Sequence, residues 1–156
     1  MSQGVVFWRE NKQALERAAT VYGVAPEIIV AIIGVETRYG RGTGKFGVVD
    51  ALSTLAFDYP PRAKFFRGQL TEHFLLSREE GKNPLSMKGA YAGAMGFGQF
   101  IPSSYRAHAA DFDNDGVRDI WANKTDAIGS VANYFAEHGW QGSNDVVERV
   151  TLSEMT

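Results

Sequence analysis

The stretch PEIIVAIIGVETRYG, residues 26–40, decides the fold of this chain. Pro26 suits the first turn of a helix, and the aliphatic run that begins at Ile28 predicts a helix buried on every face. Glu36 closes that run, so we expect its carboxyl group to be partly desolvated. Desolvation and the negative end of the helix dipole both favour the protonated form of a carboxyl group. A general acid needs that form, which makes Glu36 the first candidate catalytic residue.

Helical patterns extend outward from this stretch in both directions. Apolar residues at helical spacing predict one helix from about Val6 to Tyr22, with Gly23 as its stop. Later helices are expected over residues 50–57 (capped by Asp50), 61–81 (opened by Pro61), 102–111 and 125–139 (capped by Thr125 or Asp126). Gly-rich loops separate them at residues 40–47 and 82–100, and a strand-like piece is expected around Val146 to Leu152. The pattern predicts an all-α fold in a single domain, residues 1–156.

Composition excludes several classes of function. Of the 156 residues, 44% are hydrophobic and 22% charged, which is ordinary for a globular protein. The net charge of -2 argues against nucleic-acid binding, and the absence of cysteine excludes disulfides and thiol chemistry. No apolar run is long enough to predict a transmembrane helix. The sequence MSQG at residues 1–4 lacks the features of a signal peptide, so we expect either a cytosolic protein or an export signal absent from this chain.

The segment DFDNDGVRD, residues 111–119, has the pattern of a calcium loop. Carboxylates at positions 1, 3 and 5, followed by Gly116 at position 6, match the first half of an EF-hand. Ala122 stands at position 12 where the pattern requires Glu, so the loop must be longer than usual. The expected ligands are Asp111, Asp113, Asp115, the backbone carbonyl of Val117, and Asp126.

Other interpretations of this loop remain open. It can be a solvated Asp-rich turn in which Asp126 acts only as a helix cap, and sodium or magnesium can occupy the same oxygens. A single unpaired loop favours a structural Ca²⁺ over a calcium sensor. No cofactor is expected for the chemistry itself.

Three segments carry a resemblance to a known family: residues 34–40 (GVETRYG), 92–105 (AGAMGFGQFIPSSY) and 126–135 (DAIGSVANYF). They are similar to the membrane-bound lytic transglycosylase B family, in the same order, and the similarity runs from about Gly4 to Trp140. The resemblance implies a lysozyme-like helical domain that acts on bacterial peptidoglycan strands. It also implies location in the periplasm of a Gram-negative bacterium. We further expect a monomer with no nucleic-acid partner.

The resemblance further implies a mechanism and site residues. Glu36 would be the sole acid and then base, cleaving the bond between N-acetylmuramic acid and N-acetylglucosamine without water. The N-acetyl group would stabilise the oxocarbenium-like centre, and the 6-hydroxyl of the muramic acid would attack to give a 1,6-anhydro product. Gln99, Tyr134 and Arg62 would bind substrate. Tyr134 is equally consistent with a core aromatic residue, and Arg62 with a solvated charge.

The chain also departs from the family pattern. Ala90 stands where members often have a serine in a Lys-Gly-Ser segment, so a hydroxyl contact is missing there. We expect the chain to lack the family's N-terminal helical region, and also the further C-terminal segment that supplies aromatic and Asn groups to the cleft. The missing hydroxyl and the missing segments both argue against a complete groove and full activity.

Two rival functions remain open at this point. A lysozyme-type hydrolase would need a second carboxylate to activate water, and Asp50 and Asp58 are the candidates near in sequence. An inactive, shortened peptidoglycan-binding fragment with a structural calcium is the second rival.

Overall fold

The computed structural model describes residues 1–142, and within this range seven α-helices make up most of the regular structure. The helices are α1 Gln3–Glu10, α2 Lys12–Tyr22, α3 Pro26–Thr37, α4 Val48–Asp58, α5 Ala63–Glu79, α6 Pro102–His108 and α7 Lys124–Glu137, with a 3₁₀ turn, η1, at Pro60–Arg62. Two short strands, β1 Phe46–Gly47 and β2 Lys88–Gly89, pair antiparallel. The mainly helical prediction is therefore confirmed. The strand expected around Val146 to Leu152 lies outside the described residues.

The single helix predicted from Val6 to Tyr22 is wrong, because the chain breaks at Asn11 into α1 and α2. Asn11 leaves the helical region with φ −119°, and its side-chain amide donates a hydrogen bond to the carbonyl of Phe7 at 2.8 Å. Asparagine competes for backbone groups in this way and so tends to end helices. The break lets the two short helices pack against α3 separately.

The prediction that α3 is buried on every face is also wrong. One face is buried through Ile29, Val30, Ile33 and Thr37, where α1, α2 and α7 pack against it. On the other face Val35 is 82% exposed, and Glu36 is exposed too. The neighbouring helices cover one side of α3, and no pattern within the helix itself can show this. Glu36 therefore stands at an open surface.

Helix ends depart from the predicted caps at three places. Gly47, not Asp50, is the residue before α4. The turn η1 takes up Pro61, so α5 starts at Ala63. Asn123, rather than Thr125 or Asp126, caps α7, and its side-chain oxygen accepts from both of those backbone N–H groups at 3.0 and 3.2 Å.

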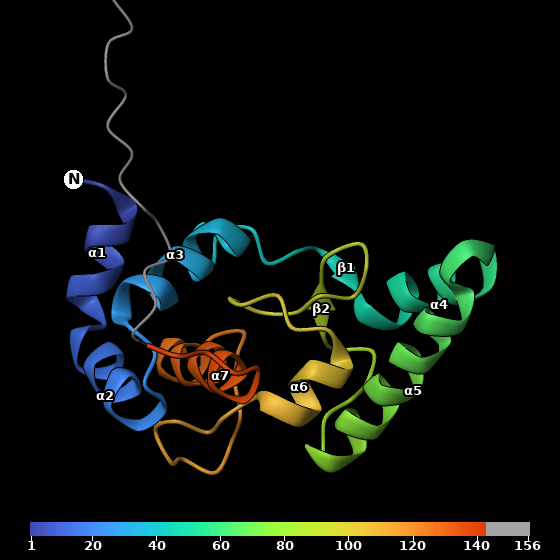
Figure 1. Cartoon of the computed structure of the whole chain (residues 1–156). Helices are drawn as coiled ribbons and strands as arrows, with labels where there is room; N and C mark the ends of the chain where they lie inside the picture. The colour runs from blue at the N-terminus through green and yellow to red at the C-terminus, as the bar shows by residue number, and fades with distance from the viewer. Residues whose placement is uncertain (143–156) are drawn as a thin grey trace, which may run out of the picture.

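The elements form two groups with a third set between them (Figure 1). α1, α2 and α3 lie at one end, and the α4–α5 hairpin lies at the other. α6, α7 and the two-stranded sheet lie between them (Figure 1). The core is continuous across these parts and includes Ile33, Leu52, Met95, Tyr105 and Ile128, all fully buried. Within residues 1–142 no single helix is long and apolar enough to cross a membrane; α2 and α3 together reach the required length, with a bend of 115° between them.

Candidate active site

The end of α3 is tied to the segment 95–100 by Thr37, the residue after Glu36. The buried hydroxyl of Thr37 donates a hydrogen bond to the carbonyl of Phe97 at 2.9 Å and accepts one from the backbone N–H of Gly40 at 3.1 Å. A buried hydroxyl that is bonded in this way fixes the elements it joins. Thr37 thereby sets the distance between the carboxyl-bearing end of the helix and the segment opposite.

The chain turns away sharply after Thr37. Arg38 and Tyr39 both have left-handed backbone conformations, with φ 50° and 61°, which is uncommon for residues other than glycine. The turn brings the Tyr39 ring back over α3 at Gly34, where a Cβ atom would lie 2.5 Å from the Tyr39 hydroxyl. Non-glycine residues in such conformations cost energy and cluster at functional sites.

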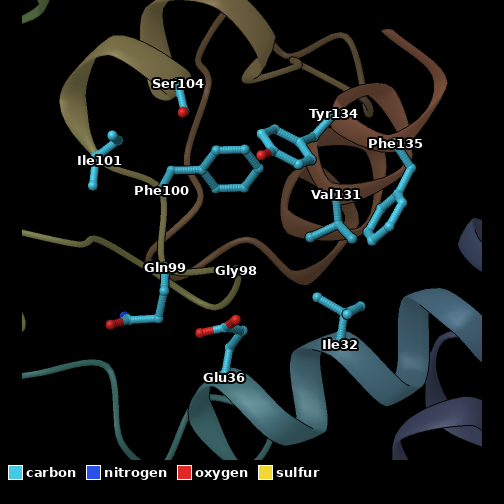
Figure 2. A pocket seen from close by; sticks show the side chains of 10 residues that line it. All are labelled: Ile32, Glu36, Gly98, Gln99, Phe100, Ile101, Ser104, Val131, Tyr134 and Phe135. Carbon is cyan, nitrogen blue, oxygen red and sulfur yellow. The ribbon is translucent and has the colours of Figure 1, made fainter. Parts of the chain in front are cut away.

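The segment 95–100 forms a second wall as a tight turn. Met95 and Phe100 exchange two backbone hydrogen bonds of 2.9 Å each, and Gln99 lies in the left-handed region with φ 54°. The Gln99 amide donates to the carbonyls of Gly96 at 3.0 Å and Thr43 at 3.3 Å. These bonds hold the Gln99 side chain in place beside Glu36 (Figure 2).

Helix α7 supplies the third wall. Val131, Tyr134 and Phe135 lie at spacings of three and four residues, so they share one face of the helix. The Tyr134 ring meets the Phe100 ring edge-on, with centroids 5.9 Å apart. Gly98 is required where this wall meets the turn, because a Cβ atom there would lie 2.8 Å from the Phe100 ring and 2.9 Å from Val131.

Together these walls enclose a cavity of about 320 Å³ (Figure 2). Its lining is Ile32, Glu36, Gly98, Gln99, Phe100, Ile101, Ser104, Val131, Tyr134 and Phe135. Glu36 and Gln99 lie on the same side of the cavity, and the rings of Phe100, Tyr134 and Phe135 lie across from them (Figure 2). The cavity therefore offers one carboxyl group and one amide against a largely apolar wall.

Glu36 is the one acidic residue in this lining. Within residues 1–142 its carboxyl group has no hydrogen bond or salt bridge to another side chain or to the backbone, and it is exposed. The partial desolvation predicted for Glu36 is therefore wrong for the free protein, because the face of α3 that carries it borders the open cavity. The carboxyl group is free to meet a ligand.

The structure brings together Glu36, Gln99 and Tyr134, three of the four residues predicted for catalysis and substrate binding. Arg62 lies elsewhere: it lines a separate hollow on η1 and α5, and its guanidinium lies 4.3 Å from the Phe65 ring centroid. Asp50 and Asp58, the acids that a hydrolase would need, do not line the cavity.

The prediction missed most of the apolar lining. Ile32 lies one helical turn before Glu36, and Val131 and Phe135 lie on the same face of α7 as Tyr134, so helical spacing carried the signal for them. Phe100 and Ser104 carried no comparable signal. They join the cavity through the turn at residues 95–100, where Gln99, a residue other than glycine, adopts a left-handed backbone conformation beside the left-handed Gly96.

The Asp-rich loop gathers its carboxylates as predicted. Asp111, Asp113, Asp115 and Asp126 each offer a carboxylate oxygen, and these oxygens lie within 4.8 Å of one another. Gly116 makes the sharp turn with φ 90°. Carboxylate oxygens are the type of ligand that Ca²⁺ takes in proteins, so these four donors fit Ca²⁺. The part expected of the Val117 carbonyl stays a prediction.

Asp126 is the buried member of this cluster. Its oxygens accept backbone hydrogen bonds from Phe112 at 2.8 Å, Asp113 at 3.4 Å and Asp119 at 2.9 Å. Burial is the main cause of the raised pKa of Asp126, and the Asp119 and Phe112 N–H groups act against it. The Asn123 amide is the main reason that the pKa of Asp113 lies below its usual value. Asp126 thus links both ends of the loop to the start of α7.

Comparison with known proteins gives consistent matches. The family model described as "Transglycosylase SLT domain" matches residues 1–156. Membrane-bound lytic murein transglycosylase B of Escherichia coli is 56% identical over 146 residues, 94% of this chain and 40% of that protein. The chain therefore spans less than half the length of this relative.

Solved structures agree with the fold. Soluble lytic transglycosylase SltB1 of Pseudomonas aeruginosa matches with a TM-score of 0.91 and 60% identity, over 92% of this chain and 48% of that one. The Escherichia coli lytic transglycosylase Slt35 in complex with calcium matches with a TM-score of 0.88 and 56% identity, over 92% and 46%. SltB3 of Pseudomonas aeruginosa in complex with NAG-anhNAM-pentapeptide matches with a TM-score of 0.86 and 36% identity, over 91% and 38%.

Proposed function

Because this chain belongs to the transglycosylase SLT domain family, we propose that it is a peptidoglycan lytic transglycosylase with Glu36 as its acid and base. One observation carries the proposal: the cavity between α3, α7 and residues 95–100 has a lone carboxyl group in its lining. Most glycosidases use two carboxyl groups, and substrate assistance is a recognised exception. A reaction in which one carboxyl group performs both proton transfers suits this cavity.

In the first step Glu36 donates its proton to the oxygen of the bond between N-acetylmuramic acid and N-acetylglucosamine. The bond breaks, the N-acetylglucosamine side leaves with the proton as an alcohol, and Glu36 becomes a carboxylate. Positive charge at the anomeric carbon of the muramic acid is stabilised by its own N-acetyl oxygen. A bound glycan strand displaces water from the apolar lining, which strengthens the interaction between the carboxylate and the developing charge.

In the second step the carboxylate of Glu36 removes the proton from the 6-hydroxyl of the same muramic acid. The hydroxyl oxygen bonds to the anomeric carbon, giving the 1,6-anhydro ring and returning the proton to Glu36. No water is consumed, so the enzyme is a lyase. The relative SltB3 was solved with an anhydro-muramyl ligand, which supports a product of this kind.

The other site residues have defined parts in this proposal. Gln99, held by the carbonyls of Gly96 and Thr43, keeps its amide oxygen for a substrate N–H or hydroxyl group. Tyr134 presents its ring and hydroxyl to the sugar. Arg62, in its separate hollow, is placed to meet a distant part of the strand or its peptide. The substrate lies in the cell envelope, so we place the enzyme in the periplasm of a Gram-negative bacterium.

Calcium enters the proposal as a structural ion. Slt35 was solved with calcium, and the four carboxylates of this loop fit the same metal. A bound Ca²⁺ would neutralise the clustered negative charge of Asp111, Asp113, Asp115 and Asp126. It would hold the loop against α7, which carries Tyr134.

Digestion of purified sacculi with this chain tests the function. Mass spectrometry is expected to find muropeptides with anhydro ends, lighter by one water than reducing ends. Reducing ends would instead identify a hydrolase. Binding to sacculi without release of muropeptides would identify an inactive binding fragment, and the variant Glu36→Gln gives the inactive reference for that comparison.

A further inference from the structure

Two histidines contact the ring of Tyr134. His138 stacks on the ring, with centroids 4.0 Å apart and an interplanar angle of 25°. His108 meets the ring edge-on, at 5.3 Å and 86°. We name His108, His138 and their neighbour Glu137 the histidine collar. The collar joins α6 to the C-terminal end of α7 beside the cavity lining.

Each histidine is itself fixed by a polar contact. Nδ1 of His108 lies 2.5 Å from a carboxylate oxygen of Glu137, and the His108 carbonyl accepts a hydrogen bond from the Asn133 amide at 2.9 Å. Nδ1 of His138 lies 2.7 Å from the carbonyl of Tyr134. The two imidazole rings therefore have little freedom to turn away from Tyr134.

The Tyr134 hydroxyl, in contrast, has no hydrogen-bond partner among residues 1–142 and lies beside the Phe100 ring at the cavity (Figure 2). Ring contacts alone hold it in place. Aromatic pairs in stacked and edge-on geometry contribute beyond their buried area. Loss of the His138 stack would leave the ring with only its edge-on contacts to Phe100, His108 and Phe135, and so with more freedom to move.

From this geometry we infer that His108 and His138 are positioning residues for Tyr134, and that through them substrate binding in the cavity depends on pH. The inference rests on the proposed function for the identity of the substrate. Histidine is the side chain that ordinarily changes charge between pH 5 and 8. The two rings lie 4.9 Å apart, a distance at which two positive charges repel.

The other charged and titratable groups near the collar lie close to Tyr22 on α2 or are paired elsewhere. On α2, burial raises the pKa of Tyr22, while Arg17 lowers it and Glu137 raises it. On α6, Arg106 is paired with Glu72 and Glu79. On α7, Glu137 is the carboxylate in contact with the collar. Among residues 1–142, protonation of both histidines therefore leaves the Glu137 carboxylate against two cations: His108 gains attraction to Glu137 and the two rings repel each other, which changes the contacts around Tyr134.

The first test observes the free protein by NMR. With ¹³C-labelled tyrosine, and Tyr134→Phe to assign the signal, the Tyr134 ring resonance is expected to move between pH 5 and 8. The movement should be smaller in His138→Phe and absent in the double variant with His108→Phe. A wild-type signal that does not move, or one that moves equally in the double variant, overturns the inference. This test does not depend on any enzymatic activity.

The second test separates KM from kcat during digestion of glycan strands. His138→Ala is expected to raise KM about threefold to tenfold, the effect of losing one aromatic stack, with kcat changed less than KM. His138→Phe keeps a ring and is expected to restore KM at neutral pH and to flatten the pH dependence of KM. Phe57→Ala, which removes a ring 68% exposed on α4, serves as the control with unchanged KM.

Equal KM values in wild type and His138→Ala overturn the inference, and so does a fall in kcat with KM unchanged. A wild-type chain that releases no anhydro product contradicts the proposed function instead. In that case binding of a soluble glycan fragment takes the place of KM. The Glu36→Gln background keeps the fragment intact, and His138→Ala should weaken its binding by the same factor.

Discussion

Glu36 and Asp126 are two carboxyl groups near helix ends, with opposite surroundings. Glu36 lies in the last turn of α3, is exposed, and has no polar partner among residues 1–142. Asp126 lies in the first turn of α7, is fully buried, and accepts three backbone hydrogen bonds. The helix dipole favours a negative charge at Asp126, in the first turn of its helix.

The contrast separates a reactive group from a structural one. Every bond to Asp126 would have to break before that carboxylate could transfer a proton to a substrate. Glu36 has no such bonds to lose, and the task of fixing the local structure falls to its neighbour Thr37. Changes at Glu36 should therefore affect turnover without affecting stability, and changes at Asp126 should do the reverse.

The largest effect is expected from Glu36→Gln. The amide keeps the size of the side chain and cannot donate or accept the catalytic proton, so release of anhydro-muropeptides should fall by about 10³-fold or more. The melting temperature should stay within about 1 °C, because the carboxyl group has no partner among residues 1–142 to lose. Glu27→Gln, an exposed glutamate in the first turn of the same helix, is the matched control with full activity. Turnover retained in Glu36→Gln would remove Glu36 from the mechanism.

Asp126→Ala should give the largest loss of stability. Three backbone N–H groups lose their acceptor, and buried donors left unsatisfied cost about 1–3 kcal/mol each before relaxation or entry of water. We expect the free energy of unfolding to fall by about 3 kcal/mol in urea titrations. Asp126→Asn keeps one acceptor oxygen and should lose roughly half as much. A loss no greater than that of the exposed control Asp58→Ala would contradict the structural role.

Calcium should act on the Asp126 region and leave the chemistry at Glu36 untouched. At a free concentration one hundred times the Kd, binding to the folded state alone adds about 2.7 kcal/mol of stability. Thermal unfolding should therefore shift upward with calcium and downward with EDTA. Asp113→Ala and Asp115→Ala should abolish the shift, and Asp50→Ala, outside the loop, should keep it. A shift that survives both loop substitutions would place the ion elsewhere.

How far the sequence could predict these two regions depends on the range of the interactions. The aliphatic run of α3 and the alternate carboxylates at Asp111, Asp113 and Asp115 are local patterns, so they predicted the helix and the loop. The exposure of Glu36 depends on which neighbours cover α3, and those neighbours come from distant parts of the chain. For the same reason a helical pattern continued across Asn11, where one side-chain hydrogen bond was enough to break it.

The predictions for the site residues also depend on whether the relevant contacts are local or come from distant parts of the chain. Gln99 and Tyr134 came from a family resemblance, and the structure places both in the cavity with Glu36. Their geometry depends on contacts that no local pattern contains: the left-handed backbone of Gln99, and the meeting of Tyr134 with Phe100. The resemblance also assigned Arg62 to substrate binding, but Arg62 lines a hollow that is separate from the cavity of Glu36.

The smallest effect tests whether Thr37 supplies the order that Glu36 itself lacks. Thr37→Val keeps the shape of the side chain and removes the hydroxyl, so the Phe97 carbonyl and the Gly40 N–H lose their partner. Urea titration should show a loss of about 1–2 kcal/mol. Thr37→Ser, which keeps the hydroxyl, should recover most of it. Thr54→Val removes an exposed hydroxyl bonded within its own helix and should cost less than about 0.5 kcal/mol.

Because Thr37 sets the spacing between Glu36 and residues 95–100, Thr37→Val should also lower kcat/KM severalfold. An unchanged kcat/KM alongside the loss of stability would show that the cavity keeps its geometry without this hydroxyl.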